Sequence, residues 1–334
     1  MKKTTNIILL ISLIVLFLSC SENSRREREI ANIEMDIKIE RFDEDLVDCS
    51  NNFSNEEISK MSEKYLEFFD IYNERIIMIG NANTPHYHNN LKLFLDDYSV
   101  KEAYKQVKEV YYDTEELEEN IQKVFKHVAY YYPEYKIPRL ATYVSGFNQS
   151  IVITENFIAV GLDKYLGENC KLYEMLSVQK YLRHEMSPDF IPADISRAVA
   201  EDICINNPEN VTLLSEMMYN AKVMYFIKTM IPDLPDEILF KYTKEQLEYC
   251  KANEEAIWAL MIEKKILFST DFFEIKKLTQ NAPFTTMLGP DSPPRIANWI
   301  AYQILQSYME NNSCSLQELM ANNNYQLIMQ LSQY

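Results

Sequence analysis

Residues 137–167 read IPRLATYVSGFNQSIVITENFIAVGLDKYLG, and this stretch decides the fold because most of the chain on either side has helical patterns. Three of the chain's five glycines lie here. Short runs rich in β-branched and aromatic residues occupy 140–144, 151–154 and 157–160, with turn residues between them. We therefore predict an α+β fold that is mostly helical, with a small mixed sheet packed by many helices.

The segment at 33–42 is expected to add one strand. Apolar and charged residues alternate there with a period of two, which is typical of a half-buried strand. Arg41-Phe42-Asp43 is expected to turn the chain. We place this strand at an edge of the same sheet.

Helical periodicity accounts for most of the remaining chain. A predicted capping box of Ser54 and Glu57 begins the first long helix. A Met-rich apolar stripe marks the helix at 209–230, and we interpret this stripe as core. The expected helices are 54–79, 90–112, 114–132, 178–185, 192–206, 209–230, 243–268, 271–280 and 292–311, with two short ones after them. No linker interrupts the pattern, so we predict one globular domain over 32–334.

The composition is that of an ordered globular protein, with 47% hydrophobic and 25% charged residues. The formal net charge is −17. Nucleic acids are polyanions, and a strongly acidic chain is repelled by them. Nucleic acid is therefore excluded as an expected partner.

The N-terminus resembles a bacterial lipoprotein signal. Two lysines precede an apolar core at 7–17, which is too short to span a bilayer as a helix of about 20 residues. Leu18-Ser19-Cys20 follows and resembles the lipobox, in which the cysteine is lipidated and becomes the first mature residue. The alternative is an ordinary signal with a chance cysteine. We expect a signal peptide over 1–19 and a polar tether over 20–31.

The other cysteines do not suggest a metal or redox site. They are Cys49, Cys170, Cys204, Cys250 and Cys314, widely spaced and without a C-x-x-C pair. Scattered cysteines in a helical chain are usually small buried apolar residues. We expect no disulfide or one.

Motifs for metal or nucleotide chemistry are incomplete. His184-Glu185 is the only His-Glu pair, and Pro188 stands where a zinc-protease helix needs its second histidine. We therefore interpret His184 as an ordinary surface or cap histidine and Glu185 as a bystander. His86-x-His88 supplies only two ligands. We predict no cofactor and no metal site, although a carboxylate couple from distant segments stays open.

Six motifs after the lipobox carry a family resemblance. They are Ile39-Glu40-Arg41-Phe42-Asp43, Tyr143-Val144-Ser145-Gly146-Phe147-Asn148, Gly161-Leu162-Asp163-Lys164-Tyr165-Leu166-Gly167, Asn253-Glu254-Glu255-Ala256-Ile257-Trp258, Ala282-Pro283-Phe284-Thr285 and Ser292-Pro293-Pro294-Arg295-Ile296-Ala297-Asn298-Trp299-Ile300. In this order they resemble GldB, the gliding-motility lipoprotein family of Bacteroidetes-type bacteria. The resemblance covers nearly the whole mature chain.

That resemblance implies a body similar to predicted zincin-type metalloproteases. The zinc helix of such a fold would fall at about 193–207, which contains no histidine. The following helix would carry a Glu-Gly pair with the glutamate ligand, and this chain has Asn220-Ala221 instead. The resemblance thus implies a zincin-like scaffold without an intact zinc motif, a pseudoenzyme.

The leading function is a non-catalytic, lipid-anchored protein that binds envelope proteins of the gliding-motility or associated secretion apparatus. An envelope hydrolase of atypical kind is the alternative, and a periplasmic chaperone is a third. The candidate partner-binding edge is Tyr143, Ser145, Gly146, Phe147 and Asn148, which would bind a partner strand through unpaired backbone groups; the alternative is a tight hairpin turn. Ser21 directly after Cys20 favours the outer membrane, facing the periplasm.

Overall fold

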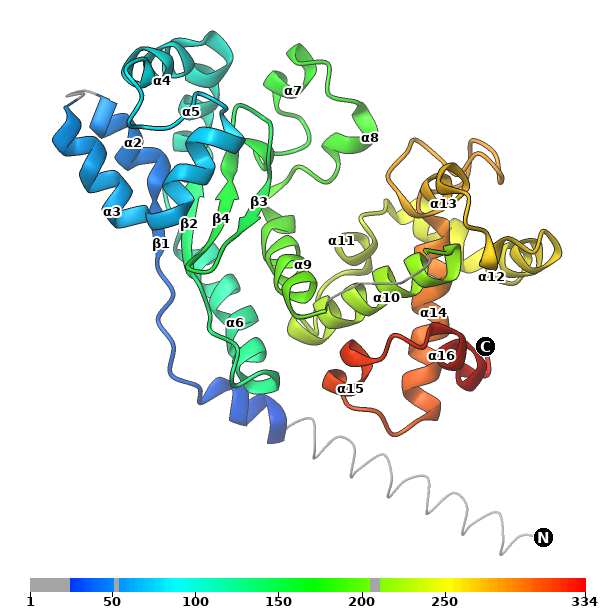
Figure 1. Cartoon of the computed structure of the whole chain (residues 1–334). Helices are drawn as coiled ribbons and strands as arrows, with labels where there is room; N and C mark the ends of the chain where they lie inside the picture. Colours follow the sequence, from blue (N-terminus) through cyan, green and yellow to red (C-terminus); the bar gives the residue numbers. More distant parts are fainter. Residues whose placement is uncertain (1–24, 51–53, 205–210) are drawn as a thin grey trace, which may run out of the picture.

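The computed structural model describes residues 25–50, 54–204 and 211–334. The expected signal peptide and Cys20 lie outside these ranges. The predicted class is confirmed, because a small mixed sheet of four strands is packed by many helices (Figure 1). Among the described helices, none is both long and apolar enough to cross a membrane.

The sheet has the strand order β1-β2-β4-β3. Strands β2 (Arg139–Tyr143), β3 (Ile151–Ile153) and β4 (Phe157–Gly161) arise from the three predicted runs. Strand β2 pairs in parallel with both β1 (Ile39–Arg41) and β4, whereas β3 pairs antiparallel with β4. Strands β2 and β4 are buried almost throughout, as continuous apolar runs predict.

The expected N-terminal strand is shorter than its alternating pattern suggested. Only Ile39–Arg41 pair with β2, because the preceding residues run along helix α6 (Glu115–Tyr131) instead. Its side chains take the backbone donors: the Ile37 N–H donates to Gln122 Oε1 (3.1 Å) and the Ile39 N–H to Glu118 Oε1 (3.0 Å). The expected turn at Arg41-Phe42-Asp43 is instead the start of helix α2 (Phe42–Ser50).

Alternate side chains of the sheet serve two hydrophobic cores. Ala141, Tyr143 and Phe157 face an aromatic core with residues of α2, α3 (Asn55–Ile71), the π-helix η1 (Tyr72–Ile76) and α4 (Tyr87–Asp96). Leu140, Ile158 and Val160 face the larger core, which contains residues of α6, α9 (Ile191–Ile203) and α10 (Leu213–Met230). Figure 1 shows α3 and α9 on opposite sides of the sheet.

The remaining helices build the larger core. The Met-rich stripe of α10 is confirmed as core, since Met217, Met218 and Met224 are buried. Bounds are α5 Tyr98–Val110, η2 Leu162–Lys164, α7 Lys171–Met175, α8 Lys180–Arg183, η3 Pro188–Phe190, α11 Asp236–Phe240, α12 Lys244–Glu263, η4 Ile266–Phe268, α13 Phe272–Thr279, α14 Ile296–Asn311, α15 Leu316–Ala321 and α16 Tyr325–Ser332. The five described cysteines are free, four of them buried.

Several long predicted helices are broken at identifiable residues. Asp97 divides the helix expected at 90–112, because its extended backbone lets its carboxylate accept from Ser99 N (2.8 Å) and Val100 N (3.2 Å) and so cap α5. The helix expected at 243–268 ends where Lys265 adopts a left-handed conformation (φ 55°). The helix expected at 292–311 starts at Ile296, after a left-handed Arg295.

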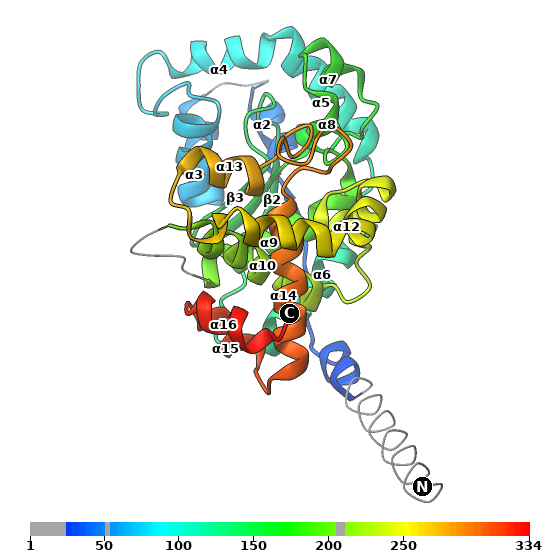
Figure 2. The same cartoon turned by 90° about the vertical axis from the view of Figure 1, so that its right-hand side faces the viewer.

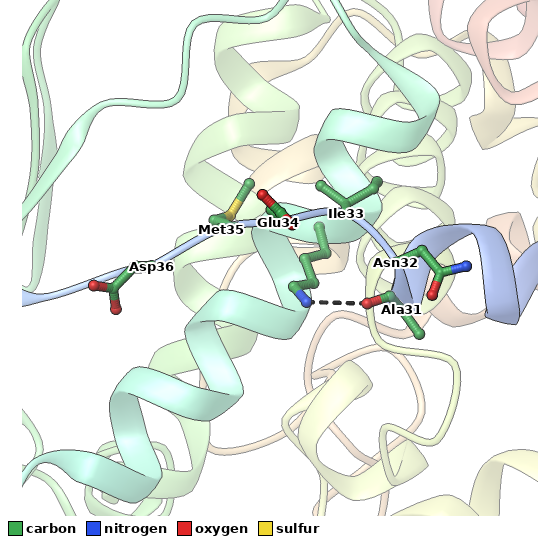
Figure 3. Close-up of a pocket in the computed structure, with 7 residues that line it drawn as sticks. Ala31, Asn32, Ile33, Glu34, Met35 and Asp36 are labelled. Atoms are coloured by element: carbon green, nitrogen blue, oxygen red, sulfur yellow. Dashed lines mark hydrogen bonds between the residues drawn. The ribbon is translucent and has the colours of Figure 1, made fainter.

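Part of the expected tether belongs to the folded body. Residues 25–31 form a helix, and Ile30 is buried. Lys126 of α6 donates to the Ala31 carbonyl (3.3 Å), and residues 31–36 run past it along α6 (Figure 3). The described chain therefore contacts the folded body from the helix at 25–31 onward.

Candidate functional site

The predicted partner-binding residues do not form a free edge. Tyr143 lies in β2, a central strand paired on both sides, and is fully buried. Ser145 is also fully buried, whereas Phe147 is half-buried and Asn148 is exposed. The expectation of unpaired backbone groups at these positions is wrong for Ser145 and Phe147, because both N–H groups donate to one carboxylate.

That carboxylate belongs to Asp163, which follows β4 and is completely buried. It accepts from Ser145 N (3.0 Å), Ser145 Oγ (3.1 and 3.0 Å) and Phe147 N (2.6 Å). Burial raises the pKa of Asp163, and these hydrogen bonds oppose the rise. Ser145 Oγ in turn accepts from Asn148 N (3.0 Å). The segment is a turn built around a buried carboxylate, and no local sequence pattern identified Asp163 as its centre.

Gly161 keeps the start of β3 close to this turn. A Cβ on Gly161 would lie 2.3 Å from the Gln149 carbonyl oxygen and 3.2 Å from the Tyr143 ring. Only glycine allows that approach.

The free edge of the sheet on this side is β3. Because Gly161 N donates to Ser150 O and Thr154 N donates to Phe157 O, the alternation of an antiparallel ladder points the backbone groups of Ile151 and Ile153 away from β4. Gln149 Nε2 donates to Ile151 O (3.0 Å). Among the described residues, nothing hydrogen-bonds to the Ile153 backbone on its outward side. Residues 151–153 are half-buried, and helix α9 packs against β3.

Glu67 of α3 holds the turn that follows β3. It accepts from Thr154 Oγ1 (2.6 Å), Asn156 N (3.0 Å) and Asn156 Nδ2 (3.0 Å). Burial alone would raise the pKa of Glu67, but these hydrogen bonds to the ionised form outweigh it and hold the pKa at about 2. The β3–β4 hairpin is thus fixed to α3 by a charged acceptor.

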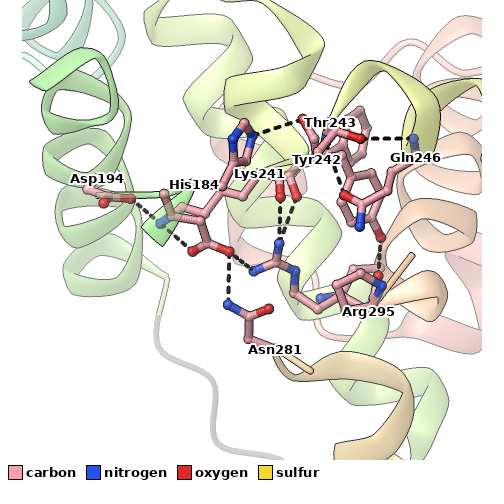
Figure 4. A network of polar contacts seen from close by, with 12 residues as sticks. His184, Asp194, Lys241, Tyr242, Thr243, Gln246, Asn281 and Arg295 are labelled. Carbon is pink, nitrogen blue, oxygen red and sulfur yellow. Dashed lines mark hydrogen bonds and ion pairs between the residues drawn. The ribbon is translucent and has the colours of Figure 1, made fainter. Parts of the chain in front are cut away.

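A second polar cluster surrounds Glu185 (Figure 4). Its carboxylate accepts from Arg295 Nη1 (2.9 Å) and Asn281 Nδ2 (2.9 Å), and lies 3.6 Å from Lys241 Nζ. Lys241 also pairs with Asp194 of α9 (2.8 Å). The side chains of Glu185 and Arg295 are each only 15% exposed. Glu185 is therefore part of a largely buried polar network, and its interpretation as a bystander in function stays a prediction.

The backbone of this cluster is strained at both cations. Lys241 and Arg295 each have a φ of 55°, a left-handed conformation that is unfavourable for residues other than glycine. Arg295 Nη2 donates to the carbonyls of Phe240 (3.2 Å) and Lys241 (2.9 Å). The two strained residues are thus bound to each other and to Glu185, which joins the ends of α11 and α14 to the segment before α9.

His184 lies at the rim of this cluster. Its side chain is 31% exposed, Nε2 is 3.3 Å from the Tyr242 carbonyl, and Nδ1 is 3.7 Å from Glu168. The expectation of an ordinary surface or cap histidine agrees with this position.

The helices expected to carry zinc ligands hold other interactions. Asp194 of α9 accepts from Tyr165 Oη (2.8 Å) and pairs with Lys241. Asn220 of α10 donates to Asn298 Oδ1 (3.4 Å). Over residues 25–50, 54–204 and 211–334, no three His, Cys, Asp or Glu side chains are grouped as metal ligands would be. His86 and His88 lie at the start of α4.

In the cluster around Glu185, the carboxylates of Glu185 and Asp194 each have a cation beside them. The fold is a helix-rich α+β scaffold in which β1 and β3 are the edge strands of the described sheet. Residues 23–334 match the family described as gliding motility protein GldB, so the chain belongs to that family. No curated protein and no solved structure matches. The expected family is confirmed, and with it a role in gliding motility in the cell envelope.

Proposed function

We propose that this protein is a non-catalytic, lipid-anchored component of the gliding apparatus or its associated secretion system, and that it binds an envelope protein along the β3 edge. The observation that carries the proposal is the outward backbone of Ile153. An edge strand with unpaired N–H and C=O groups accepts an added strand from a partner. The expected binding region thereby moves from Tyr143–Asn148 to the adjoining β3, with exposed Asn148 at its start.

The engagement of Glu185 supports a non-catalytic role. A general base must be able to reach the proton that it abstracts. Glu185 instead accepts from Arg295 and Asn281, and its partner Lys241 is shared with Asp194. Glu185, the acidic residue of the only His-Glu pair in the sequence, therefore has a structural role in this proposal.

Lipidation of Cys20 would hold the body close to the bilayer. Four residues lie between Cys20 and Arg25, where the described chain begins, so this segment can span at most about 17 Å. We place the anchor in the outer membrane, with the body in the periplasm.

The test is a proline at the outward position of β3. Ile153→Pro removes the outward N–H and leaves the ladder to β4 intact, since proline is tolerated on the free side of an edge strand. Ile153→Ala removes a similar part of the side chain but keeps the N–H. In cells that carry only the variant, we expect Ile153→Pro to abolish colony spreading and Ile153→Ala to preserve it. Equal spreading of both variants, at wild-type protein levels, would refute the β3 edge as the binding site.

A further inference from the structure

A large groove runs along helix α6. Its volume is about 1390 Å³, and it is lined by residues of α6, of the helix at 25–31, of the end of α5, of the turn at 188–192 and of the segment at 230–238. In Figures 1 and 2 the helix at 25–31 lies below the sheet, next to α6. The groove is separate from β3, whose residues are not among those that line it.

The dimensions of the groove suit an extended protein segment. The α6 residues that line it run from Glu116 to His127, which is about 17 Å along the helix axis. An extended chain of about five residues covers that distance. The volume also exceeds the range of about 300–1,000 Å³ that is usual for small-molecule pockets. A peptide therefore fills this groove better than a small molecule does.

Apolar side chains make up much of the lining. Leu117 of α6, Pro192 of α9 and Ile238 of α11 line the groove, as do Ile231 and Leu234 between α10 and α11. Covering such a surface removes apolar area from water, which contributes about 25 cal/mol per Å². A segment that binds here therefore gains most if it carries apolar side chains.

The acidic side chains of the groove favour a cation. Six acidic and three basic residues line it. Four of the acids, Glu116, Glu119, Asp189 and Asp233, have neither a hydrogen bond nor an ion pair within the described parts of the chain. Their charges are thus available to a ligand.

The three basic residues of the groove already have acceptors. Lys123 Nζ donates to Asn120 Oδ1 (3.4 Å), and Lys126 donates to a carbonyl of the N-terminal segment (3.3 Å). Arg26 lies 3.9 Å from Glu27. The free charges of the groove are therefore negative.

His127 offers a buried acceptor at one end of the groove. Its side chain is only 10% exposed. The Lys123 carbonyl can only accept, so Nδ1 donates to it (2.9 Å), and Nε2 of the neutral ring is left as an acceptor. Nε2 has no hydrogen-bond partner among the described residues, and Glu27 Oε2 is 3.7 Å from it. A buried acceptor without a donor is unfavourable, and a lysine ammonium from a ligand would satisfy both Nε2 and Glu27.

We propose that the groove along α6 binds an extended protein segment that carries lysine or arginine together with apolar side chains. The apolar lining contacts the apolar side chains, the unpaired acids attract the cations, and His127 accepts a hydrogen bond from the segment. This goes beyond the proposed function, because it gives the protein a second binding site with its own partner chemistry.

A peptide probe tests this binding on the complete mature chain with Cys20→Ser. The probe is a fluorescein-labelled twelve-residue peptide that repeats lysine, leucine and glycine. One companion peptide has serine in place of leucine, and another has glutamate in place of lysine. We expect fluorescence anisotropy to show that the lysine–leucine peptide binds at least about tenfold more tightly than the lysine–serine peptide, and that the glutamate peptide does not bind.

Groove variants locate the bound peptide. Glu116→Gln with Glu119→Gln should weaken binding about fivefold at low salt and less at high salt. Glu248→Gln with Glu255→Gln makes the same charge change at exposed positions of α12 and should leave binding unchanged. His127→Phe keeps a ring but removes the acceptor, and should weaken binding about tenfold.

Three results would overturn the proposal. They are no binding of the lysine–leucine peptide, equally tight binding of the lysine–serine peptide, and equal binding by the α6 and α12 glutamine variants. Failure of the groove is distinguishable from failure of the β3 edge. The proposal expects Ile153→Pro to leave peptide binding unchanged, whereas binding lost in Ile153→Pro but kept in the groove variants would place the peptide at β3 and refute the groove.

Discussion

Replacing Glu185 with alanine should destabilise the folded protein markedly. The carboxylate is 15% exposed and is bound by Arg295 and Asn281 at 2.9 Å each, with Lys241 at 3.6 Å. Removing one partner of a buried ion pair costs about 3–5 kcal/mol, because the other charge stays buried without it. Arg295 keeps two carbonyl acceptors and Lys241 keeps Asp194, so we expect the low end, about 3 kcal/mol.

Urea unfolding followed by circular dichroism measures this loss as a lower free energy of unfolding. For a chain of this size, about 3 kcal/mol corresponds to a fall of about 4 °C in the thermal midpoint. Glu109→Ala, an exposed acid on α5, is the matched control and should change stability by less than about 0.5 kcal/mol. If Glu185→Ala were as stable as Glu109→Ala, the network around Glu185 would not hold the scaffold together.

Three other substitutions probe the anchor, the hairpin and the turn. Cys20→Ala should move the protein from the membrane pellet to the soluble periplasmic fraction, because the lipid would be absent. Glu67→Gln should lower the free energy of unfolding at pH 7 by about 1–2 kcal/mol. The folded pKa of Glu67, about 2, lies below its ordinary value of 4.5, so this stabilisation is present above pH 4.5 and is lost as the pH falls toward 2. Asp163→Asn should cost about 2 kcal/mol in urea unfolding, because its amide N–H groups would face the N–H donors of Ser145 and Phe147.

Each of these outcomes has a clear contrary result. A Cys20→Ala protein that stays in the salt-washed pellet would contradict lipidation. A stability difference between wild type and Glu67→Gln that is as large at pH 3 as at pH 7 would contradict the charged acceptor. An Asp163→Asn protein as stable as wild type would show that the amide is accommodated at the turn.

The strands could be predicted because their signals are local. The β-branched runs at 140–144, 151–154 and 157–160 became β2, the antiparallel β3 and β4, each within a residue or two of its expected bounds. The order of the strands in the sheet depends on segments that are far apart in the sequence, so no local pattern predicts it. Tyr143 was expected at an edge, but β1 arrives from a distant segment and makes β2 central. Residues 33–38 do not form the expected strand, and the Ile37 N–H donates to Gln122 of α6 instead.

The contacts of the polar cluster around Glu185 also could not be predicted from local sequence patterns. The sequence revealed the pair His184-Glu185 and showed that it lacks a second histidine. It did not reveal that Lys241, Asn281 and Arg295 converge on Glu185, because these residues are 56 to 110 positions away. The Ser292-Pro293-Pro294-Arg295 motif contributed to the family resemblance only. The left-handed backbone conformation of Arg295 is known from the structure and not from the sequence.

Site-specific photo-crosslinking beside β3 tests the central claim most directly. A benzoylphenylalanine at Glu155, which is exposed in the turn after β3, is placed in intact cells with and without Ile153→Pro. We expect one discrete crosslinked envelope protein with the wild-type edge and with Ile153→Ala, and its loss with Ile153→Pro while the protein remains folded and anchored. The same crosslinked band at equal yield in the Ile153→Pro protein would contradict partner binding by strand addition at β3.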